Sequence, residues 1–194
     1  MNSGRAIYTI GHSTHELDPF LRLLTQHNVT AVADVRTHPF GRLPHFRRDH
    51  LAAALKGQGI DYVSLGRELG ARRAEPECYV QGQAVYECVA TLPLFREGLQ
   101  RVTTLCRQHT VALMCAEQEP LDCHRCILIC RHLKSFGFPI RHILGSGDTE
   151  KHADTENRMM QRAGIFRLLN PDAQESSLLE HAYEIRGRQI AYRM

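Results

Sequence analysis

The sequence predicts an α/β fold in which a mostly parallel sheet is flanked by helices, in a three-layer α/β/α-like arrangement. Short apolar runs alternate along the chain with longer amphipathic stretches, as they do in βαβ units. Glycine and proline separate many of these segments. The chain has 194 residues, of which 43% are hydrophobic and 23% charged, so we expect a single α/β domain over residues 1–194.

Five apolar runs have the length of buried strands. The first ends at Gly11, and the second, VTAVADV, carries its only charge near its end. Their lengths of five to seven residues are too short for buried helices, and several are rich in β-branched residues. The predicted strands cover residues 6–11, 29–35, 60–65, 111–115 and 139–144.

The stretches between the strands show helical signals. Ser13 and Glu16 have the spacing of a capping box, Asp18-Pro19 offers a second start, and Asp49 precedes another helical run. Residues 66–81 are rich in glycine, arginine and glutamate, and we predict a long loop there. The predicted helices cover residues 18–28, 50–59, 83–90, 93–108, 123–136, 154–162 and 171–187.

Composition limits the classes of protein to which the chain can belong. No apolar run approaches about 18 residues, and the N-terminus lacks an apolar signal region. The seven cysteines are an odd number and lie mostly inside apolar runs, which favours reduced thiols over a disulfide framework. We therefore expect a soluble, cytoplasmic protein with no membrane partner. The net charge of +3 neither requires nor excludes a polyanionic ligand.

Reactive and charged side chains follow four of the predicted strands. In parallel sheets ligands bind beyond the carboxyl ends of the strands, so these side chains are expected to share one site. The residues concerned are His12 and Ser13 after the first strand, Asp34 and Arg36 at the second, Cys115, Glu117, Cys123, His124 and Arg125 after the fourth, and His142 on the fifth.

The residue types suggest roles in such a site. His12, Asp34 and Glu117 are candidates for proton transfer, and Cys115 or Cys123 for the nucleophile. The candidate anion-binding residues are Ser13, Arg36, His124 and Arg125. A helix starting near Cys123 would also direct free N–H groups at the site and lower the pKa of a cysteine there. The alternatives are a structural hydrogen bond for His12, an internal Asp34–Arg36 ion pair, and an apolar packing role for Cys115.

The sequence requires no cofactor. Cys115, Cys123, His124 and His12 have acceptable zinc-ligand types, although their spacing matches no standard zinc motif. Cys123, Cys126 and Cys130 share one face of a predicted helix, as a metal-binding stripe would. Because Cys126 and Cys130 lie within the apolar run CILIC, we interpret these two as core residues.

A basic segment at residues 42–50 could contact nucleic acid. It contains Arg47 and Arg48 and is accompanied by Phe40 and Phe46, a combination that can bind phosphates and stack on bases. Charge runs are more often solvated surface. Further arginines in the 66–81 loop, Arg67, Arg72 and Arg73, add to the basic character.

Together these motifs resemble a known family, the bacterial and archaeal domain of unknown function 488. The resemblance rests on TIGHS, on DVR with a following proline, on YVSLG, on RHIL with a later His152, and above all on LMCAEQEPLDCHR. It covers nearly the whole chain and implies an α/β domain with a shared polar site at the residues named above. It supplies no reaction. Cys126 and Cys130 are outside its pattern, and RELGARR is more charged than the pattern at that point.

Three functions are compatible with these residues. We favour an enzyme whose substrate is a small anion or nucleotide, carrying phosphate and possibly derived from nucleic acid. A non-catalytic metal- or redox-sensing module that binds nucleic acid is the second. The third is a phosphatase or sulfurtransferase-like enzyme with a cysteine nucleophile, but Cys115 and Arg125 are twice as far apart as in the usual phosphate loop.

Overall fold

The computed structural model describes residues 6–166 and 174–194. Its main sheet has six strands in the order β3-β2-β6-β1-β7-β8, of which the first five are parallel and β8 is antiparallel to β7. The predicted α/β class is confirmed. The strands are β1 (Ile7–Gly11), β2 (Ala31–Asp34), β3 (Asp61–Ser64), β6 (Val111–Cys115), β7 (Ile140–Ile143) and β8 (Thr149–Lys151), and a separate hairpin pairs β4 (Tyr79–Val80) with β5 (Gln83–Ala84).

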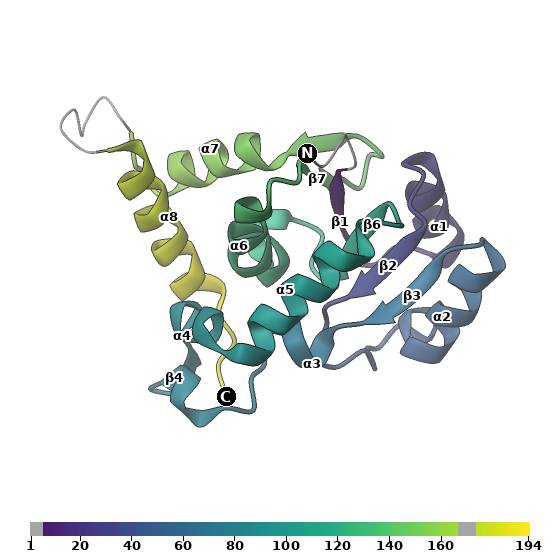
Figure 1. The fold of residues 1–194 in the computed structure, drawn as a ribbon, viewed down its shortest axis with the longest axis horizontal. Coiled ribbons are helices and arrows are strands. Elements are labelled where there is room, and N and C mark those ends of the chain that lie inside the picture. Colours follow the sequence, from purple (N-terminus) through teal and green to yellow (C-terminus); the bar gives the residue numbers. More distant parts are fainter. Residues whose placement is uncertain (1–5, 167–173) are drawn as a thin grey trace.

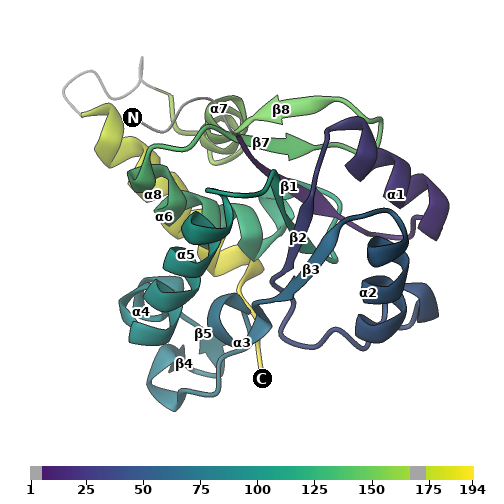
Figure 2. The ribbon, with the colours of Figure 1, turned by 45° about the vertical axis from the view of Figure 1, so that its right-hand side comes forward.

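Helices cover both faces of the sheet, as the two ribbon views show (Figures 1 and 2). On one face lie α1 (Leu17–Gln26) and α2 (Arg48–Gly57). The other face carries α3 (Gly66–Leu69), α4 (Tyr86–Thr91), α5 (Pro93–Leu105), the π-helix Arg125–Cys130 with α6 (Arg131–Leu133), and α8 (Glu175–Ile190), while α7 (His152–Arg162) lies near β7 and β8. A 3₁₀ turn, Lys134–Phe136, ends the run that starts with the π-helix.

Alternation along β6 shows how the sequence builds two cores. Val111, Leu113 and Cys115 belong to the apolar cluster beneath α3, α5 and α8. Ala112 and Met114 belong to the cluster beneath α1 and α2. Successive side chains of a strand point to opposite faces, so a central strand covered on both sides is apolar throughout. This geometry also decides that the Cys115 thiol lies on the α5 side.

Three segments differ from the sequence prediction. Residues 83–84, predicted to begin a helix, form strand β5, and helix α4 begins at Tyr86. The predicted loop 66–81 contains helix α3 and strand β4, because Leu69 and Cys78 are buried in the core. Strand β8 was not predicted, because the strand is short and its three residues are polar, but it pairs with β7 at the sheet edge. The predicted helix 171–187 corresponds to α8, and its first three residues lie outside the described part of the chain. No helix among the described residues is long and apolar enough to cross a membrane.

Candidate functional site

The central strands β2, β6 and β1 place the candidate residues at one edge of the sheet. Asp34 ends β2, and its carboxylate accepts hydrogen bonds from Arg36 Nε (2.9 Å), Arg36 Nη2 (2.7 Å) and the Arg36 backbone N–H (3.1 Å). The Tyr62 hydroxyl on β3 donates a further bond of 2.7 Å to Asp34 Oδ2. Asp34 is buried. Its acceptor positions are therefore used to orient the Arg36 guanidinium.

His12 supports the same guanidinium from the end of β1. Its Nδ1 lies 3.0 Å from the Ser13 carbonyl and its Nε2 lies 3.1 Å from Arg36 Nη1. The ring stacks on Phe46 with centroids 4.3 Å apart. Burial, and then the charge of Arg36, lower the pKa of His12 to about 4. At neutral pH the ring is uncharged, so Nδ1–H donates to Ser13 and Nε2 accepts from Arg36.

Arg36 retains donors for a ligand. A guanidinium has five N–H donors, and within the described part of the chain three of them are used, two on Asp34 and one on His12. Two N–H groups on Nη1 and Nη2 are left. Arg36 also lines two cavities that meet at this point, one of about 140 Å³ and one of about 590 Å³. The arginine is thus fixed in place with unused donors beside open space.

The smaller cavity joins Arg36 to the cysteine cluster. Cys115, Glu117, His124 and Arg36 all line it. Two exposed side chains, His38 and Arg72, stand at its rim. The larger cavity shares Arg36, His38 and Ala116 with the smaller one and extends along His12, Ser13, Thr14, Gly41, Arg42 and Leu43.

Four potential ligand or reactive groups converge behind the small cavity. The donor atoms of Cys115, Glu117, Cys123 and His124 all lie within 4.8 Å of one another. His124 Nδ1 lies 3.7 Å from Cys115 Sγ and 3.9 Å from Cys123 Sγ. The other ring nitrogen, Nε2, donates a hydrogen bond of 3.2 Å to the Val35 carbonyl, so Nδ1 faces both sulfur atoms. Burial alone would lower the pKa of His124, but its hydrogen bond to Cys123 raises it, so Nδ1 can carry a proton toward the Cys123 thiolate.

The two thiols have different electrostatic surroundings. A hydrogen bond to Cys123, together with burial, raises the pKa of the Cys115 thiol well above its ordinary value. Burial alone would raise the pKa of Cys123, but the bond from Cys115, the charge of Arg125 and the His124 ring lower it well below that value. We therefore assign the negative charge of the pair to Cys123, and Cys115 is the proton donor between them.

Glu117 lies within hydrogen-bonding distance of Cys123. Its Oε2 lies 3.0 Å from Cys123 Sγ, a distance at which two bare anions would repel strongly. Burial, and then the charge of Cys123, raise the pKa of the Glu117 carboxyl. The residue as a whole is exposed at the surface, so Glu117 connects the buried sulfur atoms with solvent.

The backbone from Cys123 to Arg125 stabilises the Cys123 thiolate. Helical hydrogen bonding starts at Cys123, whose carbonyl accepts from the backbone N–H groups of Cys126 and Ile127. The Arg125 backbone N–H points at Cys123 Sγ, 3.4 Å away. A side-chain acceptor at this position caps the first turn, and the partial positive charge of the helix start favours a thiolate. The helix predicted to begin near Cys123 is therefore present, and it begins with a π-helical segment.

The Arg125 side chain makes its hydrogen bonds to groups inside the protein. Its side chain is 0% exposed, and its Nη1 and Nη2 donate to the carbonyls of Glu117 and Gln118, while Nε donates to Thr9 Oγ1. These bonds fix the loop after β6, and the charge faces the cysteine pair. The predicted contact of Arg125 with a bound anion stays a prediction that this geometry does not favour.

Two glycines allow the loops of the site to pack backbone against backbone. A β-carbon at Gly11 would overlap the Glu117 carbonyl, and one at Gly66 would overlap the Arg36 carbonyl. Both positions therefore need a residue without a side chain. Gly41, by contrast, has no neighbouring atom within 4 Å of where its β-carbon would lie.

The prediction that His142 shares this site is wrong, since His142 lies beside Cys126 and His152 and lines neither cavity. The other predicted site residues form two groups that meet at the small cavity. His12, Asp34 and Arg36 form the first, and Cys115, Glu117, Cys123 and His124 form the second, with Ser13 on the larger cavity and Arg125 beneath. His12 does not join the possible zinc ligands, and Glu117 takes its place. The prediction missed Tyr62, although Tyr62 belongs to the YVSLG motif and lies opposite Val32, two residues before Asp34.

The basic segment 42–50 has only part of the predicted features of a nucleic-acid surface. Arg47 and Arg48 are exposed, and Phe40 is 68% exposed. Phe46 is wrongly predicted as a base-stacking residue, since it is fully buried against Phe20 and His12.

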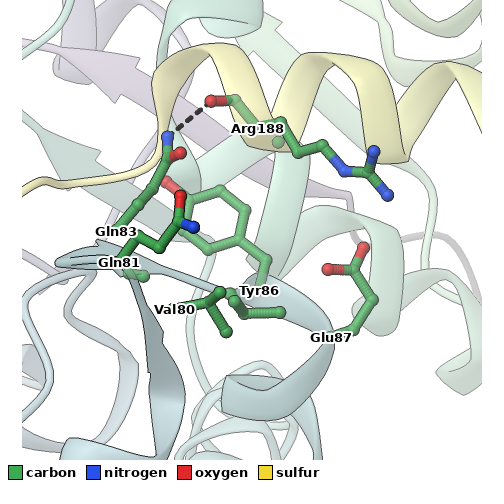
Figure 3. Close-up of a pocket in the computed structure, with 9 residues that line it drawn as sticks. Val80, Gln81, Gln83, Tyr86, Glu87 and Arg188 are labelled. Carbon is green, nitrogen blue, oxygen red and sulfur yellow. Dashed lines mark hydrogen bonds between the residues drawn. The ribbon is translucent and has the colours of Figure 1, made fainter.

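A third cavity, of about 340 Å³, lies apart from these residues, between the β4–β5 hairpin, α4 and α8 (Figure 3). The Gln83 side chain donates to the Arg188 carbonyl across it, at 2.6 Å. Its lining contains neither cysteine nor histidine, and Glu87 is its only carboxylate. It therefore lacks the reactive groups found at the strand ends.

Comparison with known proteins gives a family and no activity. No curated protein and no solved structure matches the chain. The family described as "Domain of unknown function DUF488" matches residues 16–131, more than half of the sequence. The matched segment contains the Asp34–Arg36 pair and the whole stretch from Cys115 to Arg125. The chain therefore belongs to the DUF488 family of domains of unknown function.

Proposed function

We propose that this protein is an enzyme that binds a small anionic group at Arg36 and acts on the bound molecule with the Cys115 thiol. One observation carries the proposal: the unused N–H groups of Arg36 and the Cys115 thiol belong to the same cavity. An oriented donor pair and a potential nucleophile lining one cavity are the parts that such an enzyme requires.

The anion would be held by preformed donors. Because Asp34, Tyr62 and His12 already fix the Arg36 side chain, little conformational entropy is lost when an anion binds. A guanidinium with two free N–H groups suits a phosphate or carboxylate. His38 and Arg72 at the rim add hydrogen bonding and positive charge.

The cysteine pair supplies the nucleophile. Because the pKa of Cys115 is raised and that of Cys123 is lowered, the Cys115 proton passes to the Cys123 sulfur only as Cys115, which lines the cavity, bonds to the electrophilic atom of the substrate. The leaving group departs with its bonding electrons. Cys123, which is 1% exposed, serves as the base in this step, with Glu117 as the connection to solvent.

The substrate is larger than its anionic group. The small cavity of about 140 Å³ accommodates a phosphate-sized group, and the adjoining cavity of about 590 Å³ has room for a nucleoside-sized body. We propose a phosphate- or nucleotide-bearing substrate on this basis.

Peptide-mapped alkylation of the native protein with iodoacetamide tests the proposal. We expect Cys115 to be labelled near neutral pH, with inorganic phosphate or a nucleoside monophosphate slowing the reaction at least several-fold. Cys88, a half-buried cysteine outside the site, is the internal control and should label at the same rate with and without phosphate. In the variant Arg36→Lys, which keeps the charge but not the paired donors, protection of Cys115 should be lost.

Two results would contradict the proposal. One is a Cys115 that stays unlabelled while Cys88 reacts fully. The other is equal phosphate protection in the wild type and in Arg36→Lys, which would place the anion elsewhere.

A second candidate function is metal binding by the same four residues. Cys115, Glu117, Cys123 and His124 have zinc-ligand atoms within 4.8 Å of one another, and the neutral His124 ring would present Nδ1 to the metal. In that case zinc would block alkylation of both Cys115 and Cys123, and a chelator would restore it. Protection by phosphate alone, in a protein treated with chelator, favours the first candidate.

A further inference from the structure

A second cluster of cysteine and histidine lies deeper in the molecule. Cys126 on the π-helix, His142 on β7 and His152 at the start of α7 bring their side-chain donor atoms within 4.8 Å of one another. All three residues are buried. They come from three elements separated in sequence, so the fold itself creates the cluster. None of them lines the cavity at Arg36.

The two imidazoles are oriented by their outer nitrogens. His142 Nδ1 lies 2.7 Å from Thr9 Oγ1, and His152 Nε2 lies 3.0 Å from the Tyr183 hydroxyl. Tyr183 donates its own proton to Glu156 at 2.7 Å, so it accepts from His152 Nε2–H. The lone pair of His152 Nδ1 then faces the centre of the cluster. Outer hydrogen bonds of this kind fix the ring and the tautomer of histidines that bind metals.

The inner atoms have the separations of a metal site. His142 Nε2 and His152 Nδ1 are 3.0 Å apart, and Cys126 Sγ is 3.9 Å from each of them. Zinc binds nitrogen at about 2.0 Å and sulfur at about 2.3 Å, which puts neighbouring ligand nitrogens about 3.3 Å apart in a tetrahedral site. The Cys126 sulfur is equally distant from both nitrogens and too far from either for a strong hydrogen bond, as expected if all three atoms are ligands of one ion.

An ion could reach this cluster from the surface. A cavity of about 330 Å³ is lined by His152 together with Ile140, Arg141, Lys134 and Glu156. It opens beside β7 and α7, on residues different from those of the cavities at Arg36. Glu156 accepts bonds from Lys134 and Tyr183 there, which places a carboxylate at the entrance.

We propose that Cys126, His142 and His152 bind one zinc ion. The metal would replace the direct contact between the two imidazoles. Cys126 would release its proton on binding, and His142 would carry its proton on Nδ1 and donate it to Thr9 Oγ1. The ion would join the π-helix, β7 and α7. This site does not depend on the chemistry proposed for Cys115.

Cobalt titration of the untagged, full-length protein tests the site. Co²⁺ bound to a thiolate gives a sulfur-to-metal charge-transfer band, and we expect one equivalent to saturate this band in the wild type. The band should be absent from Cys126→Ser. It should persist in the matched control Cys130→Ser, which changes another buried cysteine four residues away that is outside the cluster. The band should also persist in the double variant Cys115→Ser with Cys123→Ser, which would show that the metal is not bound at the small cavity.

X-ray absorption of the zinc-loaded wild type gives an answer even if Cys126→Ser does not fold. One sulfur and two imidazole nitrogens around zinc support the proposal. Two sulfurs with one imidazole would place the metal at Cys115 and Cys123, and the proposal would be wrong. It would also be overturned if the wild type bound neither cobalt nor zinc, since the two histidines would then form a simple hydrogen bond.

Discussion

Arg36 and Arg125 are both buried at the carboxyl edge of the same sheet, and they use their guanidinium groups differently. Arg36 bonds to the side chains of Asp34 and His12, keeps two N–H groups unused and lines the small cavity. Arg125 donates to two backbone carbonyls and to Thr9, and it is 0% exposed. Their positions in the sequence, Arg36 just after a predicted strand and Arg125 in the first turn of a predicted helix, do not predict this difference.

The difference shows which charge each arginine balances. Arg36 is paired with a carboxylate, so the pair is neutral and still offers directional donors to a ligand. Within the described part of the chain Arg125 has no carboxylate partner, and its charge lowers the pKa of the Cys123 thiol. We infer that Arg125 stabilises the thiolate and the loop after β6, while Arg36 is the arginine available to a substrate.

Replacing Arg125 is the change expected to have the largest effect. Arg125→Ala would leave two carbonyls and a thiolate without their buried partner, and we expect a loss of about 3–5 kcal/mol in the free energy of unfolding, measured by urea denaturation at pH 7. The control is Arg101→Ala, which removes a partly exposed ion pair with Glu68 and should cost less than about 1 kcal/mol. If Arg125→Ala unfolded like the wild type but lost phosphate protection of Cys115, the contrast between the two arginines would be refuted.

Lowering the pH should reduce the contribution that His12, beside Arg36, makes to the free energy of unfolding. The folded state holds the pKa of His12 at about 4, below the value of 6.5 for a free histidine, so the unfolded chain binds more protons between these values. The contribution of His12 to stability is therefore complete above pH 6.5 and is lost as the pH falls toward 4. We expect the slope of unfolding free energy against pH in this window to decrease in His12→Gln, by at most about 1.4 kcal/mol per pH unit.

His181 provides the comparison for this measurement. It lies on the exposed side of α8, and His181→Gln should leave the slope unchanged. An unchanged slope in His12→Gln as well would mean that His12 is not held uncharged against Arg36.

The smallest expected effect concerns Tyr62. Tyr62→Phe removes one hydroxyl that donates to Asp34 while keeping the ring, and we expect a loss of about 1 kcal/mol in the free energy of unfolding. Calorimetric titration with phosphate should show weaker binding, because Arg36 is oriented less firmly. Tyr79→Phe is the matched control, since its hydroxyl donates to the Arg73 carbonyl, and it should leave phosphate binding unchanged. Equal binding in both variants would mean that Tyr62 does not orient Arg36.

Much of the fold was predictable from local patterns. The run VALMC is apolar at every position because both faces of β6 are covered, and the structure assigns the strand to the same residues. The short polar strand β8 gave no such signal, since Thr149, Glu150 and Lys151 pair only through their backbones at the sheet edge. Hydrophobic periodicity detects burial, and a polar edge strand has little of it.

The site was predictable as a collection of residues but not as a set of contacts. Convergence of strand ends explains why His12, Arg36 and Cys115 come together, as the sequence analysis expected. Which nitrogen of His124 faces the sulfur atoms depends on the Val35 carbonyl, and no sequence spacing encodes that bond. The cluster at Cys126 was missed because its histidines lie 16 and 26 residues further along the chain and Cys126 sits in an apolar run.

The close packing at Gly11 has a consequence for attempts to redesign this protein. Because the end of β1 lies directly against the Glu117 carbonyl, the backbone of the loop after β6 cannot move toward β1, and insertions at residues 116–118 would disturb the end of this central strand. Gly41, on the wall of the larger cavity, has free space around it. Diversity introduced at residues 40–43 would change which molecules fit the site while leaving its reactive end intact.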